Sequence, residues 1–390
     1  MLVQKGRLVC PKCKNMNMFF ITHADGFLRA FNSFKCIRNN GNTIYNFSFT
    51  IDDKETEFPE QNNKTEEECF RSYVNWVCPD AGFDGNFFIH RKGCGFSSEN
   101  FLDFIPKFYE EKDFTRKKII AATNYGKVYS AYSTKDNAEV CIKLIDTELM
   151  QLDYENHNLK DYKDDLINEI IILTTFSDYE NSVKFYGTYD KENEKAIITE
   201  KCDLNLKQFA LKKGSPFTTE EIKNNFLSIN KIFKVLQEKL VIHRDIKLEN
   251  FLVKYTNAEK TEYIIKLSDY GISKFKNKTN SIFSGIKGSE DTIAPEITLD
   301  KVTKYESVVD IFSLGIVFYQ LTHNLRHPFG SNSNMCYNYY VLHFDKDDSI
   351  IEFDESIKDE NFKDLLSKML KINPNNRISW ENYFNHAFFQ

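Results

Sequence analysis

The sequence predicts an α+β protein in which strands and helices are segregated along the chain, preceded by a small β-rich module. Three strand-like runs come first in the larger part, at 139–145, 182–189 and 195–199. After Thr218, apolar residues recur three or four positions apart, which is the spacing of a helix with one buried face. The first 110 residues differ from this pattern because they hold six of the nine cysteines. We therefore expect a module at 1–110 and an α+β domain at 115–390.

Composition limits the classes of protein that fit. The chain has 390 residues, of which 41% are hydrophobic, so a sizeable core can form. No apolar run reaches the roughly 18 residues needed to span a bilayer, and Met1–Cys13 lacks the apolar segment of a signal peptide. A net charge of −6 gives no general attraction to nucleic acid or anionic membranes. We expect a cytoplasmic protein with no membrane span, with a nuclear location left open.

The most informative segment is 243–250, which reads H-R-D-I-K-L-E-N and is followed by D-Y-G at 269–271. Phosphoryl transfer requires an aligned acceptor hydroxyl and neutralised phosphate oxygens. The carboxylate of Asp269 and the amide oxygen of Asn250 are ligands that Mg²⁺ accepts, which leaves Asp245 to take the hydroxyl proton. The segment resembles the catalytic loop and the D-F-G element of eukaryotic-type protein kinases, with tyrosine in place of phenylalanine.

The resemblance implies a bilobal kinase fold, with a small β-rich lobe at about 115–200 and a larger helical lobe at about 203–390. It also implies ATP and Mg²⁺ as cofactors and proteins as substrates. Asp245 would orient the acceptor hydroxyl, Lys247 would steady the transferring group, and Asn250 and Asp269 would hold the metal.

The phosphate-covering loop departs most from the family. The pattern G-x-G-x-x-G-x-V falls on 121–128, where only the third glycine, Gly126, is present. Ala121 and Thr123 replace the other two, and this change puts tight wrapping of the phosphates in doubt because glycine allows the closest backbone approach. By resemblance, Val128 covers the adenine and Leu252 forms its floor.

A strand and a helix carry the next pair of residues. The run 139–145 resembles the V-A-I-K element, with Cys141 for alanine and with Lys143 as the contact to the first two phosphates. Alternation places Cys141 and Lys143 on one face, so the cysteine lines the adenine pocket. Glu169, in a helix-like segment at 165–173, is expected to pair with Lys143. The polar stretch 146–164 between them predicts an exposed, mobile insertion.

The remaining elements follow in the order that the family requires. Glu200 and Cys202 lie where the hinge offers backbone groups to adenine. The helix after Thr218 begins with a capping box to Glu221. Later motifs resemble A-P-E at 294–296 and D-x-W-S-x-G at 310–315. By resemblance, Asp310 braces the catalytic loop, and Glu296 pairs with Arg377.

Substrate class and regulation follow from the same resemblance. Lys247 and Ser289 are typical of serine/threonine kinases, whereas the peptide preference is not readable. Arg244 and Lys274 lie where such kinases bind a phosphate on the activation segment, and the candidate acceptors are Thr279, Ser281 and Ser284. The alternative is a pseudokinase or adaptor that binds nucleotide or partners without useful turnover, as the missing glycines suggest.

The first 110 residues contain a C-x-x-C pair, Cys10 and Cys13, at a spacing that suits one Zn²⁺ ion. His90 and Cys94 complete a zinc-ribbon-like set, with Cys78 as a rival ligand, whereas reduced structural cysteines and disulfides remain alternatives. A strand-like run at 43–51 precedes an expected acidic loop that continues to Glu68. Such a module could dock a protein or single-stranded nucleic acid, although core packing is the better explanation of its aromatic residues.

Overall fold

The computed structural model describes the strands within residues 1–106 and the ranges 107–156, 162–275, 291–301, 306–346 and 350–390. The chain divides into two compact units, residues 1–177 with 184–201, and residues 178–183 with 202–390. We use "small lobe" for the first unit from residue 107 onward and "large lobe" for the second. No helix in the described ranges is both long and apolar enough to cross a membrane.

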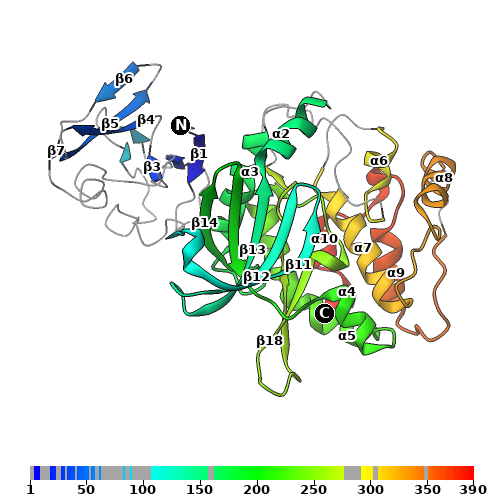
Figure 1. The fold of residues 1–390 in the computed structure, drawn as a ribbon. Coiled ribbons are helices and arrows are strands. Elements are labelled where there is room, and N and C mark those ends of the chain that lie inside the picture. The colour runs from blue at the N-terminus through cyan, green and yellow to red at the C-terminus, as the bar shows by residue number, and fades with distance from the viewer. Residues whose placement is uncertain are drawn as a thin grey trace. The chain divides into compact units, whose positions relative to one another are not determined.

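The N-terminal module is described only as strands (Figure 1). These are β1 (Gln4–Leu8), β2 (Met18–Thr22), β3 (Leu28–Ala30), β4 (Ser33–Asn39), β5 (Asn42–Ile51), β6 (Lys54–Glu57), β7 (Gln61–Asn62), β8 (Gly82–Phe83) and β9 (Phe88–Ile89). β1, β2 and β3 form one antiparallel sheet, β5 pairs with β4, β6 and β7, and β8 pairs with β9. The strand predicted at 43–51 is confirmed by β5. The expectation of an acidic loop through Glu68 was wrong for 54–57 and 61–62, because these residues form β6 and β7, which pair with β5.

A six-stranded sheet forms the small lobe, in the order β10-β14-β15-β13-β12-β11. The strands are β10 (Lys107–Phe108), β11 (Phe114–Thr123), β12 (Gly126–Ser133), β13 (Ala138–Asp146), β14 (Phe185–Lys191) and β15 (Glu194–Glu200). A short 3₁₀ turn, η2 (Glu111–Asp113), joins β10 to β11. β10 pairs in parallel with β14, so the sheet starts before residue 115, where the kinase motifs suggested that the domain begins.

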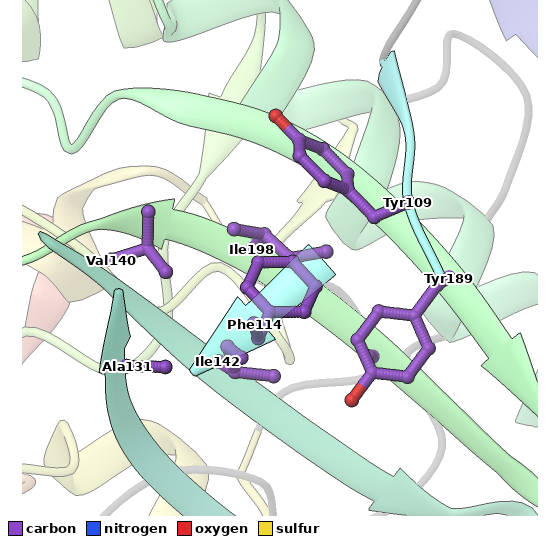
Figure 2. Packing of buried hydrophobic residues seen from close by; sticks show 8 residues of the cluster. Tyr109, Phe114, Ala131, Val140, Ile142, Tyr189 and Ile198 are labelled. Atoms are coloured by element: carbon purple, nitrogen blue, oxygen red, sulfur yellow. The ribbon is translucent and has the colours of Figure 1, made fainter. Parts of the chain in front are cut away.

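One face of this sheet is covered by a compact apolar cluster (Figure 2). Val140 and Ile142 of β13 and Ile198 of β15 are at most 1% exposed, as alternation along β13 predicted. Phe114 packs between the rings of Tyr109 and Tyr189, with ring centroids 5.3 and 5.6 Å away. This core leaves the other face of β13, which carries Cys141 and Lys143, to the site.

Two helices follow β13, namely α2 (Thr147–Asn156) and α3 (Tyr162–Phe176). The expectation of a mobile insertion at 146–164 was wrong for the part that forms α2. Asp146 caps its N-terminus by accepting a hydrogen bond from the N–H of Leu149 (2.9 Å), and Met150 and Tyr154, four residues apart, are buried. Apolar burial of this one face holds the otherwise polar segment in place.

The large lobe is mainly helical. Its helices are α4 (Leu206–Lys213), α5 (Thr219–Glu238), α6 (Pro295–Thr298), α7 (Val308–Thr322), α8 (Ser333–His343), α9 (Glu360–Met369) and α10 (Trp380–Phe384), with 3₁₀ turns η3 (Leu248–Asn250), η4 (Pro374–Asn376) and η5 (Ala387–Phe389). Short strands β16 (Leu204–Asn205), β18 (Phe251–Tyr255) and β19 (Tyr263–Leu267) form one sheet, and β17 (Val241–Ile242) pairs with β20 (Lys274–Phe275). The predicted capping box between Thr218 and Glu221 is present at the start of α5.

A chain of phenylalanine rings connects these helices to the segment that follows the catalytic motif. Phe226 of α5 contacts Phe251 of β18 at 5.6 Å and Phe318 of α7 at 4.6 Å between ring centroids, and Phe318 in turn stacks on Phe362 of α9. α7 and α9 approach closely at Gly315, where an added Cβ would lie 2.8 Å from a methyl group of Leu370. The rigid helical core therefore fixes the backbone next to Asn250.

Candidate active site

The loop from His243 to Asn250 connects β17 to β18 and is held by Asp310, on the first turn of α7. The two carboxylate oxygens of Asp310 accept hydrogen bonds from the backbone N–H groups of His243 (2.7 Å) and Arg244 (2.8 Å). Arg244 has a positive φ of 71°, a strained conformation for a non-glycine residue that these bonds help to maintain. Burial raises the pKa of Asp310 to about 6, although both N–H donors and Arg244 oppose the shift. The predicted brace on the catalytic loop is therefore present.

His243 is completely buried behind the loop. One ring nitrogen, Nε2, lies 3.1 Å from the carbonyl oxygen of Ser268, which can only accept, so this nitrogen carries the proton. The other nitrogen accepts from the N–H of Asp245 at 3.3 Å. Desolvation lowers the pKa of His243, which keeps the ring neutral and suits this pair of bonds. His243 thereby joins the backbone of Asp245 to the residue that precedes Asp269.

Asp245 contacts two other residues of the catalytic motif, Asn250 and Lys247. The side-chain amide of Asn250 donates to the Oδ2 atom of Asp245 (2.8 Å) and to its backbone oxygen (2.7 Å). The ammonium group of Lys247 lies 2.8 Å from the same carboxylate oxygen. The Asp245 carboxylate is thus oriented by the amide of Asn250 and lies beside the cation of Lys247.

The residues present fit a magnesium ion. Because the backbone oxygen of Asp245 can only accept, the NH₂ group of Asn250 must face it, and the amide oxygen of Asn250 therefore faces elsewhere. The Asp269 side chain is exposed, and its backbone has a φ of 61°. Ser268, directly before Asp269, donates to the backbone oxygen of Asn250 from both its N–H and its hydroxyl, each at 2.9 Å. Two oxygen donors of the type that Mg²⁺ prefers are thus held on connected segments.

Tyr270, which stands where the family has phenylalanine, is fully buried beside His243, with ring centroids 5.1 Å apart. Its hydroxyl lies 3.0 Å from the hydroxyl of Ser182. A buried phenol requires such a partner, so the substitution is accommodated by a serine 88 positions earlier in the chain. Burial raises the pKa of Tyr270, so the hydroxyl stays protonated.

In the small lobe, the predicted ion pair between Lys143 and Glu169 forms at 2.7 Å. Glu169 is only 4% exposed, so its carboxylate depends on this partner. Val128 lies directly opposite Lys143 in the β-ladder, and Thr199 lies opposite Cys141. Directly opposed residues share a face, so these four side chains lie on the side of the sheet away from the apolar cluster.

The thiol of Cys141 is partly buried on that face. Desolvation raises its pKa, while nearby Lys201 and Lys143 and a hydrogen bond to Thr199 act in the opposite direction. The thiol therefore stays neutral at physiological pH and acts as a small apolar surface there.

The phosphate-covering hairpin, defined here as β11, β12 and their turn, closes tightly between Thr123 and Gly126. A Cβ atom at Gly126 would lie 2.0 Å from the carbonyl oxygen of Leu144 in β13. The one glycine that survives is therefore required by the packing of β12 on β13, whatever its role toward a phosphate. Ala121 and Thr123, at the other two glycine positions, are exposed.

The hinge residues are positioned by backbone bonds. Glu200, at the end of β15, is buried, and its side chain accepts a hydrogen bond from the N–H of Lys184 at 2.7 Å. In the large lobe, Cys202 is also buried, and the N–H of Asp203 donates to the carbonyl of Val253 at 3.0 Å. Leu252 on β18 pairs with Asn205 of β16 and is partly buried.

Comparison with known proteins identifies this arrangement. The family model for the protein kinase domain matches residues 114–389. The chain belongs to the protein kinase family. It is 26% identical over 283 residues to serine/threonine-protein kinase ATG1a of Arabidopsis thaliana, covering 71% of this chain and 42% of the relative. It is 28% identical over 218 residues to human Nek5, covering 55% of this chain and 28% of the relative. It is 27% identical over 269 residues to Aurora kinase of Candida glabrata, covering 69% of this chain and 68% of the relative. The chain thus spans less than half the length of the first two relatives.

A further ion pair that this kinase was expected to contain is present in the large lobe. The guanidinium group of Arg377 donates two parallel hydrogen bonds to Glu296, at 2.7 and 2.8 Å. Both side chains are almost fully buried, and Phe312 lies against the guanidinium group at 4.9 Å from the ring centroid. The pair ties the segment that contains A-P-E to the C-terminal part of the kinase domain.

Other expected residues lie outside the described part of the kinase. The candidate acceptors Thr279, Ser281 and Ser284, and also Ser289, are among them. Lys274 is described in its backbone alone, which pairs with Ile242 in the β17–β20 ladder. The expected zinc ligands Cys10, Cys13, Cys78, His90 and Cys94 also lie outside the described residues. Within the described ranges, no group of three His, Cys, Asp or Glu side chains is placed to hold a metal ion.

Sequence reasoning missed three residues that support the site. Ser182 binds the hydroxyl of Tyr270, Ser268 joins the segment that contains Asp269 to Asn250, and Asp153 on α2 contacts the phosphate-covering hairpin. Only Asp153 could have been located from the local sequence. Met150 and Tyr154 on either side of it are four positions apart, which is the spacing of one helix face. The others are long-range contacts that no short motif encodes.

Proposed function

We propose that this chain is a serine/threonine protein kinase that transfers the γ-phosphate of ATP to protein hydroxyl groups. The observation that carries the proposal is the arrangement around Asp245, whose carboxylate is bound by both Asn250 and Lys247. The Lys143–Glu169 pair supports it independently, because it holds an ammonium group in the position where the family binds the first phosphates.

Each residue then has a defined role. Asp245 orients the acceptor hydroxyl and accepts its proton, and Lys247 neutralises charge on the transferring group. Lys143, aligned by Glu169, binds the α- and β-phosphates. Asn250 and Asp269 would hold magnesium, which supplies positive charge to the phosphate oxygens.

The substrate class is inferred from two sources. Lys247, two residues after Asp245, is typical of kinases that act on serine and threonine. The relatives that share 26–28% identity are named as serine/threonine-protein kinases of Arabidopsis and human origin. Physiological substrates and upstream activators stay outside this proposal.

The test is a radiolabelled transfer assay on the full chain with ATP and magnesium, followed by mapping of phosphorylated residues. We expect label on serine or threonine in a general protein substrate and in the kinase itself, and none with Asp269→Asn. If the parent retains nucleotide but labels nothing above the Asp269→Asn variant, the chain is a pseudokinase. Label confined to tyrosine would contradict the substrate class alone.

Regulation by phosphorylation of the activation segment extends the proposal. Arg244 lies in the catalytic loop, where a bound phosphate would reach the backbone that carries Asp245. Replacing Thr279, Ser281 and Ser284 together by alanine should lower activity. Undiminished activity of this triple variant would contradict the role of all three.

For residues 1–110 we propose a zinc-binding, partner-docking module, on the spacing of Cys10 and Cys13 with His90 and Cys94. Elemental analysis of the purified full chain should find close to one zinc ion per chain, and a Cys10→Ser, Cys13→Ser variant should lose it. Zinc-free protein with reactive thiols would show reduced structural cysteines in its place. The proposed location is the cytoplasm, which imaging of the tagged chain would test.

A further inference from the structure

The turn of the phosphate-covering hairpin is anchored by Tyr125. Its hydroxyl donates a hydrogen bond of 2.6 Å to the Oδ2 atom of Asp153 on α2. Its carbonyl oxygen accepts a second bond, also of 2.6 Å, from the N–H of Asp146 at the end of β13. The next residue, Gly126, packs against the backbone of Leu144. The side chain and the backbone of one turn residue are thus both attached to the segment that follows β13.

The partner helix α2 is itself firmly held, which makes it a rigid support. The N–H and hydroxyl of Thr147 both donate to the carbonyl of Asn193, in the turn between β14 and β15, at 2.8 and 2.6 Å. The side chain of Asn193 donates in return to Glu148 at 2.6 Å. Met150 and Tyr154 are buried. Asp153 is therefore presented to the hairpin from an element fixed at its start and along one face.

We propose that the Tyr125–Asp153 hydrogen bond is a latch that positions the phosphate-covering hairpin for ATP. The inference rests on the proposed kinase function. A loop that binds phosphates through backbone N–H groups adapts to them by the freedom of glycine, and two of the three glycine positions here hold Ala121 and Thr123. A hairpin with less freedom must be held in place beforehand. A 2.6 Å bond from a hydroxyl to a carboxylate belongs to the stronger class of hydrogen bonds.

The latch predicts a specific kinetic change. In Tyr125→Phe, which keeps the ring and removes the hydroxyl, KM for ATP should rise about five- to tenfold, the factor expected for one such bond, while kcat changes less than about twofold. Asp153→Ala should act in the same way. In Asp153→Asn, which keeps an acceptor oxygen, KM for ATP should stay close to the parent value. Tyr132→Phe is the matched control. Tyr132 also lies in the hairpin, on β12, but its hydroxyl donates to Asn137 and not to a residue of α2.

Hydrogen exchange of the backbone amides at 119–128 gives a second measurement that requires no catalysis. Tyr125→Phe and Asp153→Ala should speed this exchange, and Tyr132→Phe should not. Parent-like KM and exchange in Tyr125→Phe would overturn the latch, and so would a lower KM, which would make the contact inhibitory. If the parent transfers no phosphate, the kinase function fails, while the exchange data still decide whether the latch holds the hairpin.

Discussion

The catalytic loop matches its family motif closely, whereas the phosphate-covering hairpin matches its motif at only one of three glycine positions. From His243 to Asn250, each residue with a chemical role is present, and Asp310, His243 and Ser268 hold the loop through buried hydrogen bonds. The hairpin has lost two of three glycines, and its remaining glycine serves the contact with β13. Its turn is attached instead by partly buried side chains of Tyr125 and Asp153.

The difference follows from how each region acts. In the proposed mechanism, Asp245 and Lys247 act through a carboxylate and an ammonium group, which most other residue types lack. A hairpin that covers phosphates works through backbone N–H groups, which every residue except proline carries. Its position can therefore be maintained by various contacts, provided that the backbone stays in place. Function is tied to residue identity in the first region and to geometry in the second.

The sharpest test of this comparison is Asp245→Asn. The amide cannot accept the hydroxyl proton, so turnover should fall on the order of 10³-fold or more, equivalent to roughly 4 kcal/mol of barrier. Steady-state transfer at saturating ATP measures the effect. Nucleotide affinity should change little, because the proposed role of Asp245 is toward the acceptor hydroxyl and not toward the nucleotide. Turnover within tenfold of the parent would show that another group accepts the proton.

The hairpin should respond to a change of a different kind. In Gly126→Ala, the added Cβ atom would lie 2.0 Å from the carbonyl oxygen of Leu144. The two atoms cannot approach this closely, so β12 and β13 must separate locally. We expect a loss of about 1–3 kcal/mol in the free energy of unfolding, as in other overpacked sites. Thr123→Gly, at an exposed position on the same hairpin, is the comparison and should cost only about 0.5–1 kcal/mol, the conformational cost of a glycine in a strand. Denaturant unfolding measures both.

Equal stability of the Gly126→Ala variant and the parent would mean that the strands relax without cost. Equal losses in Gly126→Ala and Thr123→Gly would place the sensitivity in the turn itself. Either result would contradict the distinction between a glycine that strand packing requires and glycines that serve phosphate binding.

Support of the catalytic loop can be tested through Asp310→Asn. Asparagine keeps one acceptor oxygen but turns an NH₂ group toward a backbone N–H, which should cost about 1–3 kcal/mol of unfolding free energy. The cost should also depend on pH. Burial raises the pKa of Asp310 to about 6 from an ordinary value of 3.8, so its contribution is fully present below the lower value and decreases as pH rises to the upper one.

The stability advantage of the parent over Asp310→Asn should therefore be larger near pH 4.5 than near pH 7. Unfolding of both proteins in denaturant at several pH values measures this difference, and other titrating groups cancel because both chains share them. A difference that stays constant or grows with pH would contradict a raised pKa at Asp310.

Much of the site was predictable because its motifs are local. The loop at 243–250 reads as a unit, and period-two alternation in β13 correctly separated Lys143 from Val140 and Ile142. The Lys143–Glu169 contact was predictable only by resemblance, since 26 positions separate the two residues. The order of the kinase motifs along the chain therefore predicted this contact, whereas periodicity predicted only which face each side chain takes.

The missed features are those in which burial overrides composition. The segment 147–156 has the polar composition of a loop, yet Met150 and Tyr154 anchor it as α2. β14 begins at Phe185, later than the strand-like run at 182–189 indicated, because Val183 donates its N–H to Leu267 and Ser182 lies beside the same residue. Ser182 then becomes available to Tyr270, a pairing that depends on the folded large lobe.

The smallest expected effect concerns this pairing. Tyr270→Phe restores the residue usual in the family and removes one buried hydrogen bond, so we expect a loss of about 1 kcal/mol in unfolding free energy. In a Ser182→Ala background, the same substitution should cost less, because its partner is already absent. A double-mutant cycle from denaturant unfolding measures this coupling. The same cost in both backgrounds would show that the two hydroxyls lie close together without stabilising each other.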